Sequence, residues 1–210
     1  MKFSTSAIAA SFLALAAAAP LDPLTSTAAG PDPNAISVVS LTTGGTGCPA
    51  GSVAQSISSD RTTFTLIFDS YVASLGPGIP ITESRKNCQL NVHLHYPGGW
   101  QFSVFEATYR GYAELAKGQT GAQKSTYYFS GNSQQCSTES DFKGPYSSDY
   151  AFTDRVETES VVWSPCGIDG MLNINSQVRL TGDATKNGLL TTDSIDGKFT
   201  QILGFQWRKC

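Results

Sequence analysis

Apolar and polar residues alternate along most of the chain, which is the pattern of strands with one buried face. Residues 87–96 are the clearest case: every second residue from Cys88 to Tyr96 is apolar, and those between, from Gln89 to His95, are polar. Successive side chains of a strand point to opposite faces of the sheet. The segment therefore predicts a strand with one face in the core and one in water.

Further segments with the same alternation follow, separated by turn residues. No long segment has the 3.6-residue period of a helix. Pro97-Gly98-Gly99 predicts a turn, with residues 100–105 as the hairpin partner of residues 87–96. A short helical turn is expected at residues 112–116. The other predicted strands are residues 62–68, 124–129, 158–163, 171–180, 189–194 and 199–207. This pattern predicts an all-β fold, a single antiparallel β-sandwich that resembles a jelly roll.

The chain begins with a segment typical of a secretory signal peptide, residues 1–19. Lys2 is followed by a largely apolar stretch and by the small residues Ala17, Ala18 and Ala19 before Pro20. We therefore expect an extracellular protein, released from the cell and possessing paired cysteines. Residues 20–46 are rich in Pro, Ser, Thr and Gly and predict a flexible arm. The folded domain is expected at residues 47–210.

Charge and hydropathy exclude two classes of partner. Without the leader, 13 Lys and Arg oppose 17 Asp and Glu, a net charge of −4 with neutral histidines. The charges are scattered, whereas a nucleic-acid-binding protein would show a basic face or stripe. No run approaches the roughly 20 apolar residues of a membrane span. We expect no nucleic acid, no membrane span and no cofactor, and the sequence does not indicate an oligomeric state.

Five cysteines are present, an odd number for a secreted chain. They are Cys48, Cys88, Cys136, Cys166 and Cys210, without the spacing of a zinc site. Two disulfides are expected, and the residues by themselves leave the pairing open.

Six short motifs occur in a fixed order and together resemble a family of small secreted fungal and bacterial proteins, catalogued as a domain of unknown function with the number forty-three sixty. The motifs are Gly47-Cys48-Pro49-Ala50-Gly51, Arg85-Lys86-Asn87-Cys88, His95-Tyr96-Pro97-Gly98-Gly99, Tyr109-Arg110-Gly111-Tyr112, Trp163-Ser164-Pro165-Cys166-Gly167 and Trp207-Arg208-Lys209-Cys210. The resemblance implies an exported all-β domain and supplies no catalytic residues. It also implies the bridges Cys48–Cys88 and Cys166–Cys210. Cys136 is then a buried or free thiol, a link to another molecule, or a member of a different pairing.

His93 and His95, the only histidines, lie two residues apart and share one strand face. This arrangement suits two metal ligands, and it equally suits two polar residues on a solvated face. No metal site is predicted, and these two residues are the candidates should one exist. Glycoside hydrolysis needs two facing carboxylates, and the acidic residues are candidates by type only.

Tyrosines are the remaining candidates for a binding surface. Tyr109 and Tyr112 flank Arg110, and Tyr128 points away from its two aromatic neighbours in a strand. Exposed tyrosine rings could stack on sugars, so these four residues are the predicted ligand-facing set. We expect a protein without catalytic activity that binds glycan or protein at the cell wall or another extracellular or host surface. The alternatives are a secreted carbohydrate-active hydrolase, a metal-dependent enzyme using His93 and His95, and a host-interacting effector.

Overall fold

The computed structural model describes residues 30–190 and 199–210. The predicted signal peptide, residues 20–29 of the predicted arm and the end of the predicted strand at 189–194 lie outside them. Eleven strands and three short 3-10 turns are present within the described residues. The strands are β1 (Ser37–Gly44), β2 (Val53–Ile57), β3 (Thr63–Phe68), β4 (Ala73–Leu75), β5 (Arg85–Leu115), β6 (Gln119–Phe129), β7 (Gln135–Lys143), β8 (Tyr146–Arg155), β9 (Gly167–Gly182), β10 (Gly188–Leu190) and β11 (Phe199–Lys209). The turns are η1 (Pro33–Ala35), η2 (Ile81–Ser84) and η3 (Thr158–Ser160).

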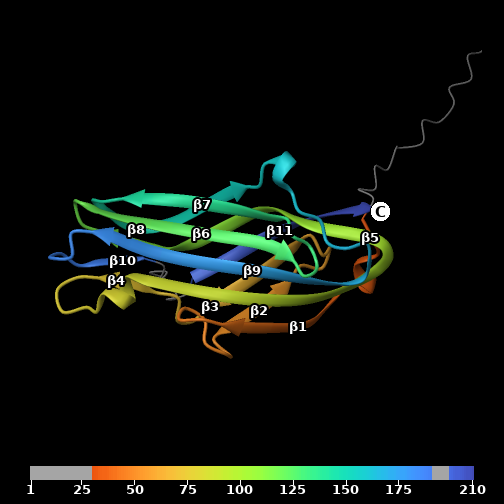
Figure 1. The fold of residues 1–210 in the computed structure, drawn as a ribbon, viewed down its shortest axis with the longest axis horizontal. Helices are drawn as coiled ribbons and strands as arrows, with labels where there is room; N and C mark the ends of the chain where they lie inside the picture. The colour runs from red at the N-terminus through yellow and green to blue at the C-terminus, as the bar shows by residue number, and fades with distance from the viewer. Residues whose placement is uncertain (1–29, 191–198) are drawn as a thin grey trace, which may run out of the picture.

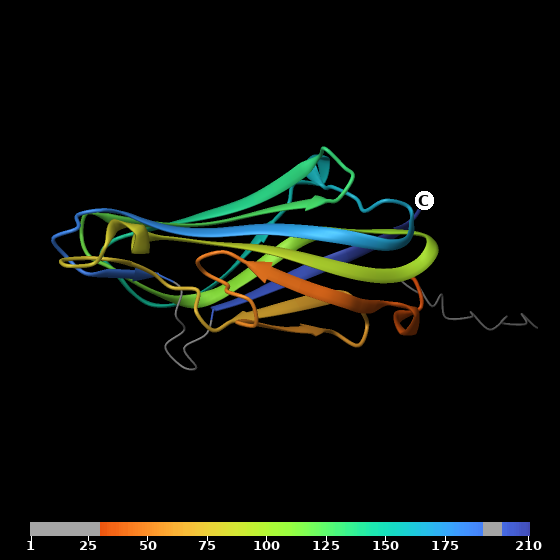
Figure 2. The same cartoon turned by 60° about the horizontal axis from the view of Figure 1, so that its bottom comes forward.

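All strands belong to one antiparallel hydrogen-bonded network with the main order β2-β3-β11-β5-β9-β6-β7. The all-β antiparallel prediction is thus confirmed. The network forms two layers because the long strand β5 takes part in both. Its first part pairs with β1 and β9, and its second part pairs with β11, β8 and β10. Figures 1 and 2 show β6, β7 and β9 in one layer and β11, β3 and β2 in the other.

The core lies between the layers and is formed by the alternate residues that the sequence pattern selects. In β3 and β6 every second residue is buried. Contacts across the core join the layers, such as the ring of Phe102 in β5 against Phe129 in β6, with centroids 5.0 Å apart. The inward side chains of residues 88–96 are all fully buried, as predicted.

The predicted hairpin between residues 87–96 and 100–105 is wrong. Both edges of the first segment are occupied by β1 and β9, and the second segment pairs with β11. The turn at Pro97-Gly98-Gly99, where Gly99 has a φ of 78°, instead carries β5 from one layer to the other. A local turn signal does not show whether the two arms pair with each other or with distant strands.

Three further predictions differ from the structure. Residues 37–44 of the predicted arm form β1, which hydrogen-bonds along the edge of β5 with Leu41 opposite Val92. An unpaired edge would leave backbone groups of β5 without partners, so this pairing outweighs the polar composition. Residues 112–115 continue β5 as a strand instead of a helical turn. The strand predicted at 158–163 is wrong: residues 158–160 form η3, residues 161–163 have no regular structure, and the neighbouring strands are β8, which ends at Arg155, and β9, which begins at Gly167.

Candidate functional site

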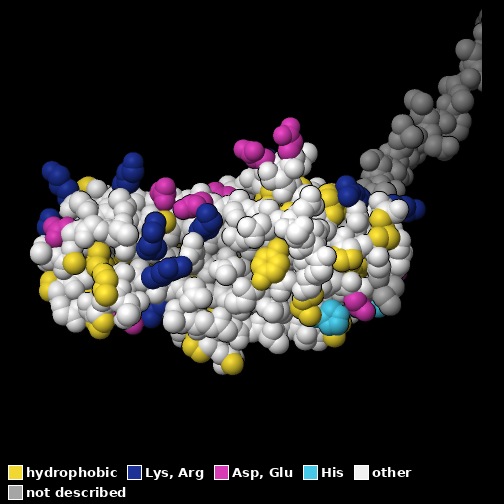
Figure 3. Space-filling view, in the orientation of Figure 1, with side chains coloured by type: hydrophobic (Ala, Val, Ile, Leu, Met, Phe, Trp, Pro, Cys, Tyr) yellow, Lys and Arg dark blue, Asp and Glu magenta, His cyan; other side chains and the backbone are white. Residues whose placement is uncertain are grey.

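The outer face of the layer formed by β1, β5, β9, β6 and β7 is covered largely by uncharged polar side chains. Figure 3 shows this face, on which most side chains are neither charged nor apolar. We call its central part the amide face, defined by outward residues of β5, β6 and β9. They are Gln89, Asn91, Thr126, Tyr128, Asn173, Asn175 and Gln177.

Tyr128 is the aromatic member of the amide face and is half-buried. It lies on β6, next to Asn173 of β9, which in turn lies next to Asn91 of β5. Its hydroxyl nevertheless accepts a long hydrogen bond from the side-chain amide of Gln89 on β5, at 3.4 Å. Because β9 lies between β6 and β5, this bond requires the side chains of Tyr128 and Gln89 to lean toward each other across β9. The ring is half-buried, so part of it is open to solvent.

The neighbouring amides are partly fixed by hydrogen bonds. Asn173 donates to the hydroxyl of Ser130 at 3.0 Å, and Gln89 makes a long bond to the side-chain oxygen of Asn91 at 3.5 Å. Asn175 is exposed. Each amide carries two N–H donors and one carbonyl acceptor, so several donors and acceptors on this face remain for a ligand or for water.

Two arginines stand at one end of the amide face. Arg85 on β5 and Arg179 on β9 are directly opposite each other, and both are exposed. Arg85 donates to the side-chain oxygen of Gln177 at 3.1 Å, which joins the pair to the amide face. Both arginines line a hollow of about 770 Å³.

His93 and His95 lie on the same outer face, at the opposite end from the arginines. His95 Nδ1 is 3.1 Å from Asp169 Oδ1, and His93 Nε2 is 3.6 Å from the same oxygen. The strand pairing of β5 with β9 brings Asp169 next to His95. Within residues 30–190 and 199–210, no group of three or more His, Cys, Asp or Glu residues has an arrangement suited to a metal ion.

Tyr109 was predicted to face a ligand, and its position contradicts this. It is 0% exposed and lies in the core between the layers. Its hydroxyl is 2.9 Å from that of Tyr127 and 2.7 Å from that of Thr138. Because side chains alternate along a strand, a buried Tyr109 places Arg110 and Tyr112 on the outside.

Arg110 and Tyr112 belong to the second part of β5, so they lie on the outer face of the other layer. Tyr112 is half-buried and its hydroxyl is 3.1 Å from that of Ser147, and Arg110 is exposed. The structure thus separates the predicted set: Tyr128 is on one outer face, Arg110 and Tyr112 are on the other, and Tyr109 is inside.

A chain of hydrogen bonds runs through the core beside Tyr109. Gln201 donates to Tyr127 at 3.0 Å, and Tyr71 donates to Ser176 at 3.0 Å. Burial raises the pKa of Tyr71, Tyr109 and Tyr127 above the ordinary value of 10.0. A phenol is charged when deprotonated, so a raised native pKa means that the folded state keeps a proton that the unfolded chain loses.

We therefore expect the contribution of these phenols to the free energy of unfolding to be constant up to about pH 10 and to fall as the pH rises further. Urea unfolding on either side of this pH measures the loss, and ultraviolet absorbance of tyrosinate should rise with unfolding. Tyr71→Phe should make the alkaline loss smaller, and Tyr112→Phe should not. A stability that does not change across this range would show that the buried phenols ionise in the folded state.

The two disulfides join Cys48 to Cys88 and Cys166 to Cys210, the pairing implied by the family resemblance. Cys136 is free and buried on β7. Burial raises the pKa of its thiol, which favours the unreactive protonated form. Cys136 is therefore a core residue of the domain.

Sequence reasoning missed Gln89, Asn175, Gln177, Arg85 and Arg179 as members of one surface. A signal was present, since polar residues alternate along both 87–95 and 173–179. It could not be used, because nothing local shows that these two segments are neighbours.

The fold and its two bridges define the class: a disulfide-bonded all-β domain of two antiparallel layers. The chain belongs to the family described as Domain of unknown function (DUF4360), whose model matches residues 34–210. A curated relative, an "Uncharacterized secreted protein" of Arthroderma benhamiae, is 56% identical over 181 residues, which cover 86% of this chain and 74% of the relative. No helix within the described residues is long and apolar enough to cross a membrane.

Two solved structures show weak similarity. The carbohydrate-binding module TmCBM61 in complex with beta-1,4-galactotriose has a TM-score of 0.30 and 15% identity, over 81% of this chain and 88% of that one. The enzymatically active domain of tailspike protein 4 of bacteriophage CBA120 has a TM-score of 0.23 and 14% identity, over 85% of this chain and 20% of that one. Similarities at this level carry no argument about function.

Proposed function

We propose that the protein acts outside the cell, at a wall or another extracellular surface, as a binding protein that holds polysaccharide on its amide face. The half-buried ring of Tyr128, whose hydroxyl bonds to Gln89 across β9, is the observation that carries this proposal. A sugar ring has an apolar C–H side and a rim of hydroxyls. The apolar side packs against an aromatic ring, and the hydroxyls need donors and acceptors nearby.

The surroundings of Tyr128 suit such a ligand. Gln89, Asn91 and Asn175 lie on the strands beneath and beside the ring and can both donate to and accept from sugar hydroxyls. Water can bridge the remaining gaps, as it does in many polar interfaces. The strands form a continuous surface, so an extended chain has room beyond a single sugar.

An extracellular location is supported by three features. Residues 1–19 are typical of a signal peptide, and the two disulfides fit an oxidising compartment. The relative from Arthroderma benhamiae is described as secreted.

The proposal predicts that Tyr128→Ala weakens retention on insoluble wall polysaccharides by about fivefold or more, since stacking on an aromatic ring contributes on the order of 1–3 kcal/mol by analogy with nucleic-acid bases. The assay scores depletion of protein from solution and release of soluble sugar. Tyr112→Ala is the matched control, because Tyr112 is also half-buried but lies on the other outer face. Its retention should equal that of the unaltered protein.

The outcomes separate the alternatives. Depletion without sugar release, lost with Tyr128→Ala alone, supports the proposal. Release of sugar would indicate a hydrolase and direct attention to the carboxylates. Equal retention of both variants would contradict a site at Tyr128, and the absence of retention on every polysaccharide would favour a protein partner, as for an effector.

A further inference from the structure

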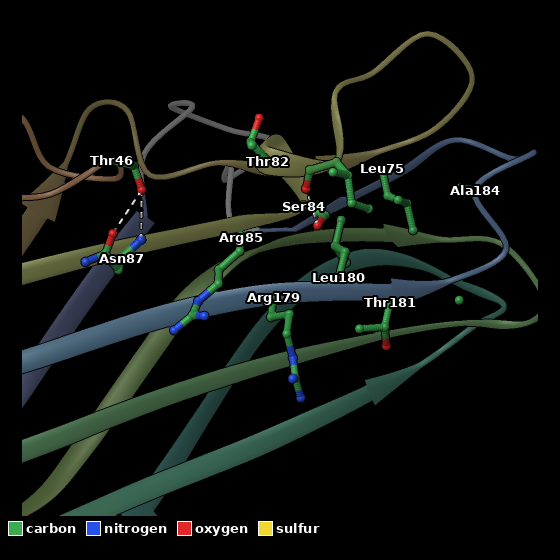
Figure 4. A pocket seen from close by; sticks show the side chains of 12 residues that line it. Thr46, Leu75, Thr82, Ser84, Arg85, Asn87, Arg179, Leu180, Thr181 and Ala184 are labelled. Atoms are coloured by element: carbon green, nitrogen blue, oxygen red, sulfur yellow. Dashed lines mark hydrogen bonds between the residues drawn. The ribbon is translucent and has the colours of Figure 1, made fainter.

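The arginine pair at the end of the amide face has an unfavourable arrangement in the isolated protein. Arg85 and Arg179 are direct partners in the pairing of β5 with β9. Directly opposite residues of an antiparallel pair have Cβ atoms about 4.5–5.5 Å apart, and like charges there are destabilising. Figure 4 shows both side chains extending to the same side of the sheet.

Neither arginine has an acidic partner among the described residues. The ion pairs found there join other residues, and the nearby Lys124 and Glu139 neutralise each other at 2.9 Å. Asp141 of β7 and Arg179 of β9 both lie opposite Ala122 of β6. One strand, β6, therefore separates Asp141 from Arg179. Within the described residues, the side chain of Arg85 donates a hydrogen bond to the neutral amide of Gln177. Figure 3 shows several Lys and Arg side chains on this part of the face, with Asp and Glu side chains beside them.

The hollow lined by the arginines has other features suited to a sugar. Thr46, Thr82 and Thr181 supply hydroxyls along it, and Leu75, Ile81 and Leu180 supply apolar surface. Ile81 is 73% exposed, an unusual position for so large an apolar side chain.

The arginines that line the hollow are joined to Tyr128 by a track of outward residues on β9. Along β9 the outward residues run from Asn173, beside Tyr128, through Asn175 and Gln177 to Arg179. At about 3.3 Å per residue this track is about 20 Å long, enough for several sugar units. A chain stacked on Tyr128 and extended along β9 would thus reach the arginines.

We propose that the ligand is an acidic polysaccharide, one whose sugar carboxylate is held between Arg85 and Arg179 while a neighbouring part of the chain stacks on Tyr128. The planar guanidinium group matches a carboxylate in a two-bonded geometry, and a carboxylate between the two arginines would remove their repulsion. This inference rests on the function proposed above and specifies the chemical class of the ligand.

The test compares three soluble polysaccharides by affinity electrophoresis of the mature protein: polygalacturonate, its fully methyl-esterified form and dextran sulfate. Polygalacturonate should bind at least about tenfold more tightly than the ester, since hydrogen bonds to a charged group contribute about 1.5–3 kcal/mol. This preference should shrink as salt is added, because exposed charges are screened. Arg85→Gln and Arg179→Gln should each remove most of the preference for polygalacturonate over the ester.

Arg110→Gln is the matched control. It removes the same charge from an exposed arginine on the other outer face, so the preference for polygalacturonate should be retained. Equal weakening by all three arginine variants, or equal binding of dextran sulfate, would indicate general attraction to anions and overturn the inference. Equal binding of polygalacturonate and its ester, lost with Tyr128→Ala, would overturn the acidic ligand and leave the polysaccharide-binding function in place. Failure to bind any glycan would overturn both proposals.

Discussion

Replacing Cys48 and Cys88 together by alanine should lower the free energy of unfolding by about 4 kcal/mol. The bridge closes a loop with a sequence separation of 40 residues. Closing this loop lowers the conformational entropy of the unfolded chain, and a loop of this length gives that magnitude. Both cysteines are fully buried, so the change also removes packed sulfur atoms from the core. The Cys48–Cys88 link fastens the segment after β1 to β5, so its loss should also loosen the edge of the first layer.

Urea unfolding of the oxidised double variant and of the unaltered protein measures this loss. Cys136→Ala is the control, because Cys136 is buried but makes no bridge, and it should lose clearly less stability. A double variant as stable as the Cys136→Ala variant would mean that the bridge contributes little to the native state. Thiol labelling of denatured, unreduced protein should find one free cysteine.

Phe102→Ala should destabilise the domain by about 3–5 kcal/mol, the usual range for a large aromatic residue removed from a core. Phe102 is fully buried in β5, and its ring lies 5.0–5.4 Å from four other aromatic rings, measured between centroids. These rings come from β5, β6 and β11: Tyr96, Phe129, Phe205 and Trp207. The alanine would therefore leave a cavity where strands of both layers meet, which the surrounding sheet cannot close by moving one side chain.

Denaturant midpoints and near-ultraviolet circular dichroism report this change. Phe105→Ala, three residues along the same strand, is the comparison, because Phe105 is only half-buried and leaves a smaller cavity. If both variants lose the same stability, the aromatic cluster is not the part of the core that joins the layers. A cluster that does join them should lose its aromatic dichroism in Phe102→Ala and keep it in Phe105→Ala.

Much of the fold was predictable because side chains alternate between the two faces of a strand, so the buried face appears in the sequence as every second residue. The alternation at 87–96 predicted a buried row from Cys88 to Tyr96, and the structure buries every member of it. The polar composition of residues 37–44 led to the wrong prediction of a flexible arm. These residues form an edge strand that is held by backbone hydrogen bonds, which do not depend on its side chains. The turn at Pro97-Gly98-Gly99 was recognised, but its role in joining two layers was not.

The candidate site was only partly predictable. Tyr128 was identified because it alternates with two apolar neighbours, and this alternation does place it outside. The same reasoning could not assign Tyr109 and Tyr112 to the buried or the exposed face, because the residues between them do not show which face of the strand is buried. Arg85 and Arg179 carry no local signal, being 94 positions apart in the numbering of the chain.

The sequence by itself determined the class of fold, the periodic choice of buried residues and, through a family resemblance, the disulfide pairing. Only the tertiary structure decided which strands are neighbours, and therefore that Gln89 meets Tyr128 across β9 and that Arg85 faces Arg179. The physical reason is that side-chain alternation is a property of one strand, whereas a surface is made by several. Antiparallel pairing is formed by backbone groups that every residue possesses, so the partner of a strand is selected by the packing of the whole core.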